Sequence, residues 1–391
     1  MDKLTDTMTL QFKVKPEYKD IIFDDFKTGI ISDVRRKWRR RKLKSPKTKP
    51  KTYLKGNNSL YFYFKGYDIF YKKPYPFTGN YGDYRLNYCH YKYRDDYILV
   101  GLRHNAIKNK SKDKLYENTL ILLASIGIDT ELLEVENKLN RIDYKHDFEC
   151  EYRPIAEHQA IMSIYSKSRD SYNGVYKEYL KKGTGIKYKP TSSYTEIIIY
   201  DKEQERKDKL KKKKKTSHIE LELKEYKNVF RTELRLKSKR LYYNKKHTFK
   251  MDKTLDNYYN EEVANECFER YVEPIFYTEP FYRIDYALIA IQSDRRLTEK
   301  EAEKLCKLVI DINKKGFTRA KAEYEYCDDT FDKHIKLLRD IEINPLCFDE
   351  GIDLAILHNF TTKDVCRDYS LYDELFRQKK KTYDEWGFEI N

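Results

Sequence analysis

Residues 192–206 read Ser-Ser-Tyr-Thr-Glu-Ile-Ile-Ile-Tyr-Asp-Lys-Glu-Gln-Glu-Arg, a stretch that begins like a strand and ends in a run of charge. Its β-branched residues follow a turn signal, which favours a β-strand. Alternate side chains of a strand share a face, so Tyr200 and Lys202 are expected side by side at its end. Glu205 follows just beyond them.

A tyrosine at such a position has a specific chemical use. It can attack a phosphodiester if a metal ion polarises the phosphate and a cation lowers the pKa of the phenol. The alternative is that Tyr200, one of 37 tyrosines, simply packs in the sheet.

Composition bounds the class of protein. The 391 residues carry a formal net charge of +15, with 37% charged and 40% hydrophobic residues. This length predicts two or three domains with cores of their own. The positive charge favours a polyanionic partner. The tyrosines suit base stacking or strand packing. The alternative is that the bias towards Lys, Tyr, Ile and Asn comes from an AT-rich coding genome.

Seven cysteines, an odd number without a Cys-x-x-Cys pair, are typical of reduced thiols in a cytosolic protein. The N-terminus lacks an apolar signal core, and no stretch approaches 18 apolar residues. We therefore expect a soluble, cytoplasmic protein without a membrane partner.

Two blocks are densely basic. Residues 33–55 surround Trp38 with cations that include Arg39 and Arg40, and residues 206–215 end in consecutive lysines, among them Lys211, Lys212 and Lys213. Each block is either a solvated flexible loop or a clamp on a phosphate backbone, in which every contact adds salt-dependent affinity.

Alternation and helical spacing together predict an α+β fold with an antiparallel or mixed sheet and a C-terminal helical domain. The domain boundary is expected near residue 250, giving a domain 1–250 and a domain 251–391. The expected strands cover 7–15, 59–71, 86–102, 139–148, 192–202, 218–223 and 229–236, and the expected helices of the first domain cover 114–126 and 154–181.

From about residue 252 the pattern becomes helical. Thr298-Glu299-Lys300-Glu301 is a capping box, and it precedes apolar residues at helical spacing up to Gly316. A further helix is expected from Thr330 to Ile341. These helices fit either a helix-turn-helix-like DNA-binding module or a small helical bundle.

Three expected strands each present polar residues on one face. They contribute Arg141 and Asp143, Tyr200 and Lys202, and Arg231 and Glu233. Any antiparallel sheet with one wet face shows this alternation. Carboxylates from different strands, together with Glu205, also suit a hard divalent cation with oxygen ligands.

These segments carry a resemblance. Arg141-Ile142-Asp143, Ile199-Tyr200-Asp201-Lys202 with Glu205, Phe230-Arg231-Thr232-Glu233 and Lys237-Ser238-Lys239-Arg240-Leu241 resemble the gene II (II/X) replication initiators of filamentous phages and related plasmids. The likeness extends more distantly to Rep_trans plasmid initiators and mobile-element relaxases. Residues 139–241 carry it specifically, through the order of the set rather than through one motif.

In that family, the tyrosine of a Tyr-x-Lys-x-x-Glu segment cuts one DNA strand at the origin and stays joined to the 5′ phosphate. The resemblance implies that Tyr200 is the nucleophile of a DNA nickase, with Lys202 beside it. It also implies that Asp143, Glu205 and Glu233 hold Mg²⁺ or Mn²⁺.

The resemblance further implies DNA contacts by Arg141, Arg231 and Arg235. The implied partners are double-stranded and single-stranded DNA at a replication origin and the replication machinery of a bacterial host, in its cytoplasm. The chain lacks the His-x-His pair of the broader rolling-circle nickases, so the metal ligands stay open; His146 and His218 lie near the relevant strands.

Two other functions are kept as alternatives. A conjugative relaxase uses the same cleavage step for DNA transfer rather than replication. A non-catalytic nucleic-acid-binding protein needs only the basic blocks and the aromatic residues.

Overall fold

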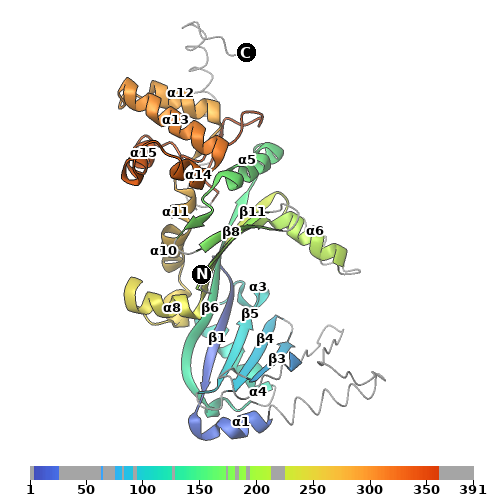
Figure 1. The fold of residues 1–391 in the computed structure, drawn as a ribbon. Coiled ribbons are helices and arrows are strands. Elements are labelled where there is room, and N and C mark those ends of the chain that lie inside the picture. Colours follow the sequence, from blue (N-terminus) through green and yellow to red (C-terminus); the bar gives the residue numbers. More distant parts are fainter. Residues whose placement is uncertain are drawn as a thin grey trace, which may run out of the picture. The chain divides into compact units, whose positions relative to one another are not determined.

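A computed structural model gives the fold of the chain (Figure 1), and it describes residues 4–25, 63–64, 75–81, 83–90, 95–125, 128–172, 175–180, 185–190, 194–212 and 225–360. The chain divides into two compact units. The first comprises Met1–Tyr144 and Arg235–Asn265, and the second comprises Lys145–Leu234 and Glu266–Asn391. The functional boundary expected near residue 250 is a different division, and it stays a prediction.

The first unit contains an antiparallel sheet with strand order β2-β3-β4-β5-β1-β6. Its strands are β1 (Thr5–Val14), β2 (Tyr63–Phe64), β3 (Tyr75–Tyr81), β4 (Tyr84–His90), β5 (Tyr97–Leu102) and the start of β6 (Leu133–Glu149). In β1, the apolar residues from Met8 to Val14 alternate with polar ones, and only the apolar set is fully buried. This alternation is why the segment forms a strand with one face in the core.

Short helices complete the first unit. They are η1 (Pro16–Tyr18), α1 (Lys19–Asp25), α3 (His104–Ile107), α4 (Lys112–Ser125), η4 (Thr130–Leu132), α8 (Ser238–Tyr243), the π-helical turn η6 (Asn244–Thr248) and α9 (Leu255–Tyr258). Helix α4 confirms the helix expected over 114–126, and Leu115 and Leu123 on it are fully buried.

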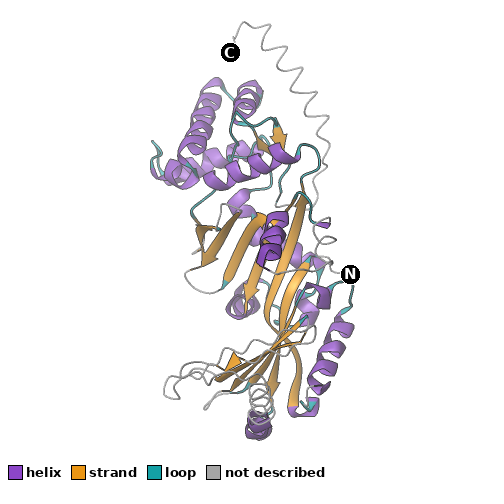
Figure 2. Cartoon of the chain, turned by 90° about the vertical axis from the view of Figure 1, so that its right-hand side faces the viewer, coloured by secondary structure: helices purple, strands orange, loops and turns teal. Residues whose placement is uncertain are grey.

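The second unit contains the strand order β6-β11-β10-β9-β8-β7. Its strands are the end of β6, β7 (Ser171–Tyr172), β8 (Val175–Tyr179), β9 (Gly185–Pro190), β10 (Thr195–Asp201) and β11 (Val229–Lys237). Helix α5 (Pro154–Lys167) and helix α6 (Lys202–Lys212) belong to the same unit. Figure 2 colours the described helices, strands and loops of the chain.

A run of helices follows in the sequence, together with a two-stranded sheet. These elements are α10 (Glu261–Tyr271), α11 (Glu273–Phe276), β12 (Phe281–Tyr282), α12 (Ile284–Ser293), α13 (Glu299–Lys315), α14 (Phe317–Ala322), α15 (Asp328–Asp340) and β13 (Ile356–Leu357). The capping box before α13 is formed, because the Thr298 hydroxyl accepts from the Glu301 N–H and the Glu301 carboxylate accepts from the Thr298 N–H. The structure therefore confirms the α+β fold with C-terminal helices.

Two boundaries differ from the predictions. The single strand expected over 86–102 is two strands, β4 and β5, which pair antiparallel with Tyr84 opposite Leu102. Asp95 and Asp96 precede β5, and aspartate favours turns rather than strands. The helix expected over 154–181 ends at Lys167, because Ser168 is extended and the tyrosine-rich β7 and β8 then pair as a hairpin.

Other predictions lie outside the described residues. These are most of the strand expected over 59–71, of which only Tyr63–Phe64 is described, and the strand expected over 218–223. Within the described part of the chain, no helix has both the length and the apolar character needed to cross a membrane.

Candidate active site at the end of strand β10

Tyr200 lies near the end of β10, as the sequence predicts. Ile197 and Ile199 beside it are fully buried, and Tyr200 is itself buried, with 8% of its surface exposed. Gly185 of β9 pairs with Tyr200 across the sheet. A Cβ atom on Gly185 would lie 2.1 Å from the Ile199 carbonyl oxygen and 2.7 Å from the Tyr200 Cα, so only glycine fits against this backbone.

Lys202 is the first residue of α6. The prediction that it shares a strand face with Tyr200 is therefore wrong. The helix begins there because the Asp201 carboxylate accepts a hydrogen bond from the Gln204 N–H at 2.8 Å, as an N-cap does. The Lys202 ammonium nevertheless donates to the Tyr200 hydroxyl at 3.1 Å. The two side chains therefore meet through the change from strand to helix.

The Tyr200 hydroxyl also has a carboxylate partner. It donates to Glu233 Oε1 of β11 at 2.6 Å, and both residues are buried. The phenol oxygen thus lies between a proton acceptor and a cation. This is the arrangement that a tyrosine needs to lose its proton and to hold negative charge.

The pKa values of this pair have opposite directions. Burial, reinforced by the negative charge of Glu233, raises the pKa of Tyr200 well above its usual value. Burial and the nearby Arg231 charge lower the pKa of Lys202 from 10.5 to about 8, although Glu205 and Glu233 oppose this shift. From the sequence we expect a neighbouring cation to lower the pKa of Tyr200; Arg231 does lower this pKa, but burial and the Glu233 charge outweigh it.

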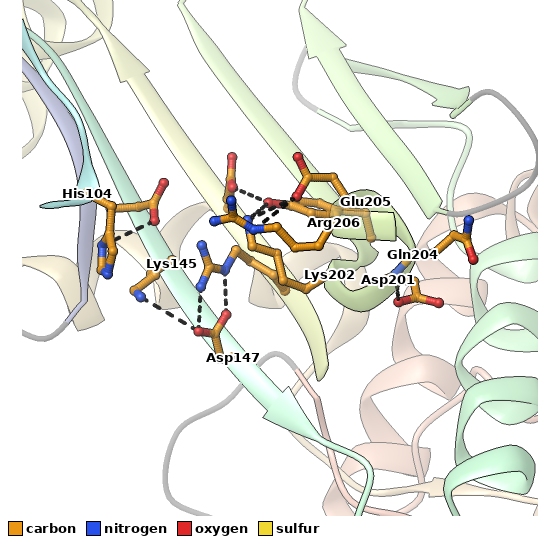
Figure 3. A network of polar contacts seen from close by, with 12 residues as sticks. His104, Lys145, Asp147, Asp201, Lys202, Gln204, Glu205 and Arg206 are labelled. Atoms are coloured by element: carbon orange, nitrogen blue, oxygen red, sulfur yellow. Dashed lines mark hydrogen bonds and ion pairs between the residues drawn. The ribbon is translucent and has the colours of Figure 1, made fainter. Parts of the chain in front are cut away.

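A second layer of charge surrounds Lys202 (Figure 3). Glu205 lies one helical turn on, with its Oε2 3.4 Å from the Lys202 ammonium and 3.7 Å from Arg206 Nε. The ring of Tyr226, which precedes β11, has three cations within 5.6 Å of its centroid. They are Lys202 at 5.6 Å, Arg206 at 5.3 Å and Arg231 at 5.4 Å.

Arg231 is the most deeply buried of these cations, with 1% of its surface exposed. Its Nε and Nη2 atoms donate to the two oxygens of Asp147 at 2.6 and 2.7 Å, a bidentate pair. Lys145 Nζ lies 3.7 Å from the same carboxylate. Burial opposes ionisation of Asp147, but the bond to Arg231 and its charge prevail and lower the pKa of Asp147.

Asp143 belongs to the first unit and has a separate set of partners. Arg141 Nε donates to it at 2.7 Å, Arg235 Nε at 3.0 Å and the Thr7 hydroxyl at 2.9 Å. Arg141 Nη2 bonds the same carboxylate. Asp143 therefore stabilises two arginines across β1, β6 and β11.

The three carboxylates expected to bind a metal ion are Asp143, Glu205 and Glu233, and each already has side-chain partners. Among the described residues, no three or more His, Cys, Asp or Glu side chains are grouped so as to hold a metal ion. Asp143 accepts hydrogen bonds from arginines, and Glu205 forms ion pairs with cations. Glu233 accepts a hydrogen bond from the Tyr200 hydroxyl. His146 is buried and packs edge-on to Phe268, whereas His218 lies outside the described residues. This donor set does not fit a divalent cation as it stands.

Most residues that are expected to contact DNA outside this site lie outside the described part of the chain. Arg39, Arg40 and Lys213 lie outside the described residues. Lys211 and Lys212 form the end of α6, and their side chains are not described. The roles assigned to these residues, and to Arg141, Arg231 and Arg235 on DNA, stay predictions.

Sequence reasoning does not assign Asp147, Arg206 or Tyr226 to the site. Asp147 carries a usable signal, since it shares the β6 face of Asp143 and Lys145 at a spacing of two. Arg206 follows Glu205 directly, but the pattern places it only in a basic block. Tyr226 gives no signal, because its place depends on the path of the chain into β11.

The comparison with protein families concerns the segment that contains these residues. Residues 102–257 match the family model for the N-terminal part of the replication-associated gene II protein, and the match includes Tyr200, Lys202, Glu205 and Glu233. No curated protein matches the chain. The match covers less than half of the chain and ends before the C-terminal helices. Residues 102–257 are therefore similar to the N-terminal part of the replication-associated gene II protein, as the sequence predicts for this segment.

Proposed function

We propose that the protein initiates rolling-circle DNA replication as a site-specific nickase and strand-joining enzyme with Tyr200 as its nucleophile. The observation that carries this proposal is the buried Tyr200 hydroxyl, which donates to Glu233 at 2.6 Å and accepts from Lys202 at 3.1 Å. These residues lie in the segment that matches a replication-associated family. The partner is origin DNA, and the host replication machinery extends the product.

The chemistry begins with a proton transfer. Because the pKa of Tyr200 is raised, less than about one phenol in a thousand is ionised at pH 7. Attack therefore needs a base, and Glu233 takes the phenol proton as the oxygen approaches phosphorus. Lys202 donates to the same oxygen and stabilises its negative charge.

The transfer exchanges one ester for another. A Tyr200 O–P bond forms, the bond from phosphorus to the DNA 3′ oxygen breaks, and that oxygen takes a proton from solvent water to become a 3′ hydroxyl. The 5′ phosphate stays on the tyrosine. A later attack by a 3′ hydroxyl reverses the exchange, returns the proton from Glu233 to Tyr200 and rejoins the strand.

The family resemblance also implies Mg²⁺ or Mn²⁺, with Asp143, Glu205 and Glu233 as ligands. These carboxylates are already bound to arginine, lysine or tyrosine side chains, and the steps above involve only side chains of the protein and the DNA. Adduct formation measured with EDTA, and with Mg²⁺ or Mn²⁺ added back, decides whether the reaction needs one.

The test of the proposal is a covalent adduct. Labelled origin oligonucleotide is incubated with protein and divalent metal and then separated by denaturing electrophoresis. Wild type should give a protein–DNA adduct, and Tyr200→Phe should fold and bind but give none. Tyr194→Phe is the matched control, since Tyr194 lies just before β10 and outside the pair with Glu233.

Two outcomes contradict the proposal. An adduct that survives in Tyr200→Phe places the nucleophile elsewhere. Supercoiled origin plasmid that stays supercoiled with wild type under every metal indicates a non-catalytic DNA-binding protein.

A further inference from the structure

A second cluster of aromatic and basic side chains lies at the surface of the first unit, directly after β11. Its side chains belong to helix α8, which is labelled in Figure 1, and to the π-helical turn η6 that follows. From Lys237 to Lys250 the chain carries six Lys or Arg residues and no Asp or Glu. This is the charge pattern of a surface that binds a polyanion.

Two neighbouring tyrosines stand out in this segment. Tyr242 and Tyr243 are 51% and 48% exposed, so about half of each side chain is open to solvent. Lys246 Nζ lies 4.9 Å from the Tyr242 ring centroid, and the Arg240 guanidinium lies 5.3 Å from that of Tyr243. We call Arg240, Tyr242, Tyr243, Lys245 and Lys246 the tyrosine patch.

The backbone holds the tyrosine patch outwards. Leu241 and Asn244 are fully buried beneath it, so the intervening tyrosines face solvent. The N–H groups of Phe249 and Lys250 both donate to the Asn244 carbonyl, at 2.9 and 3.1 Å. The π-helical turn is therefore closed, and the exposed rings do not depend on a flexible loop.

We propose that the tyrosine patch binds single-stranded DNA by stacking unpaired bases on Tyr242 and Tyr243. Bases in a duplex are stacked on one another, so exposed rings gain contact only with an unpaired strand. The adjacent cations attract phosphates of either form. The inference rests on the proposed function in one respect, since a nicking reaction supplies the single strand.

The inference is tested by fluorescence anisotropy with a short mixed-sequence oligonucleotide, used single-stranded and annealed. Tyr242→Ala/Tyr243→Ala should weaken single-strand binding roughly tenfold for each ring and leave the salt slope and duplex affinity nearly unchanged. Tyr242→Phe/Tyr243→Phe keeps both rings and should bind like wild type. Lys245→Gln/Lys246→Gln should instead lower the single-strand salt slope by about 1.4.

Tyr326→Ala is the matched control. Tyr326 is 47% exposed with Lys304 Nζ 5.6 Å from its ring centroid, but Glu325 and Asp328 surround it in the sequence. Its loss should leave DNA affinity unchanged.

The outcomes separate this inference from the proposed function. If Tyr242→Ala/Tyr243→Ala binds single strands like wild type while Tyr200 still forms the adduct, the tyrosine patch is not a stacking site and the nickase stands. An equal loss for duplex and single strand also overturns stacking. If wild type binds neither form and gives no adduct, the proposed function fails as well.

Discussion

Raising the pH should slow the proposed nicking reaction, because Lys202 loses its proton. Only the protonated ammonium can stabilise the Tyr200 phenolate, and the pKa of Lys202 is lowered to about 8 by burial and by Arg231. With that pKa, about nine in ten lysines are charged at pH 7 and about one in ten at pH 9. The rate of adduct formation should therefore fall about tenfold between these two pH values.

The fall in rate above pH 7 is the alkaline limb of the pH profile. Two neighbouring charges should move the pH at which this limb occurs, in opposite directions. Glu205 raises the pKa of Lys202 and Arg206 lowers it. Glu205→Gln should therefore shift the limb towards neutral pH, and Arg206→Gln should shift it upwards. If Glu205 were instead a metal ligand, Glu205→Gln would raise the metal concentration required and leave the limb in place.

Unfolding has the opposite pH dependence for this group. Between pH 8 and 10.5 the unfolded chain binds the Lys202 proton and the folded chain does not, so stability from this lysine rises with pH. From pH 7 to 9 the gain is about 1 kcal/mol. The titration of Lys202 therefore lowers the rate over this pH range without lowering the stability of the fold.

The assay is single-turnover adduct formation with protein in excess, at constant ionic strength and constant metal concentration. Origin binding is measured by anisotropy at each pH. A rate that is flat or rising from pH 7 to 9, with binding unchanged, would refute the role of Lys202 as the cation on the phenol oxygen.

Three further predictions concern the site and the basic block 206–215. Glu233→Gln should abolish adduct formation at every metal concentration and leave origin binding near normal; activity restored by excess metal would make Glu233 a ligand rather than the base. Asp147→Asn should lower the free energy of urea unfolding by about 2 kcal/mol, because it leaves the buried Arg231 charge without its carboxylate; a change below about 0.5 kcal/mol contradicts this. Replacing residues 211–215 with serine should weaken binding to all DNA alike and lower the salt slope, and a loss confined to origin DNA would show that these lysines read bases.

Local pattern predicted the parts of the site that depend on local geometry. The pattern predicted Tyr200 near the end of a strand of buried isoleucines, with Lys202 beside it. It did not predict that α6 begins at Lys202, which is why Lys202 and Glu205, three residues apart on a helix, meet. The capping box at Thr298 also follows from four consecutive residues. These features need no knowledge of which strands pair.

The remaining features depend on pairing between distant segments. Arg231 meets Asp147 only because β11 lies beside β6, and strand order cannot be read from the alternation within either strand. Alternation likewise identifies the faces of Asp143 and Glu233 but not their partners, so the predicted shared metal site of these carboxylates stays a prediction. The raised pKa of Tyr200 likewise depends on burial, which the spacing of charges does not measure.

The charges around Tyr200 suit one phosphodiester. Among the described residues, the contacts given above join four cations (Lys145, Lys202, Arg206 and Arg231) and three carboxylates (Asp147, Glu205 and Glu233). With Lys202 protonated, the sum is one positive charge, which one phosphodiester neutralises. Proton transfer from Tyr200 to Glu233 leaves this sum unchanged, so it moves charge from the carboxylate to the phenol oxygen beside Lys202. Loss of the Lys202 proton above pH 8 removes the excess charge and the partner of the phenolate together. Phosphate binding and nucleophile activation should therefore share one alkaline limit.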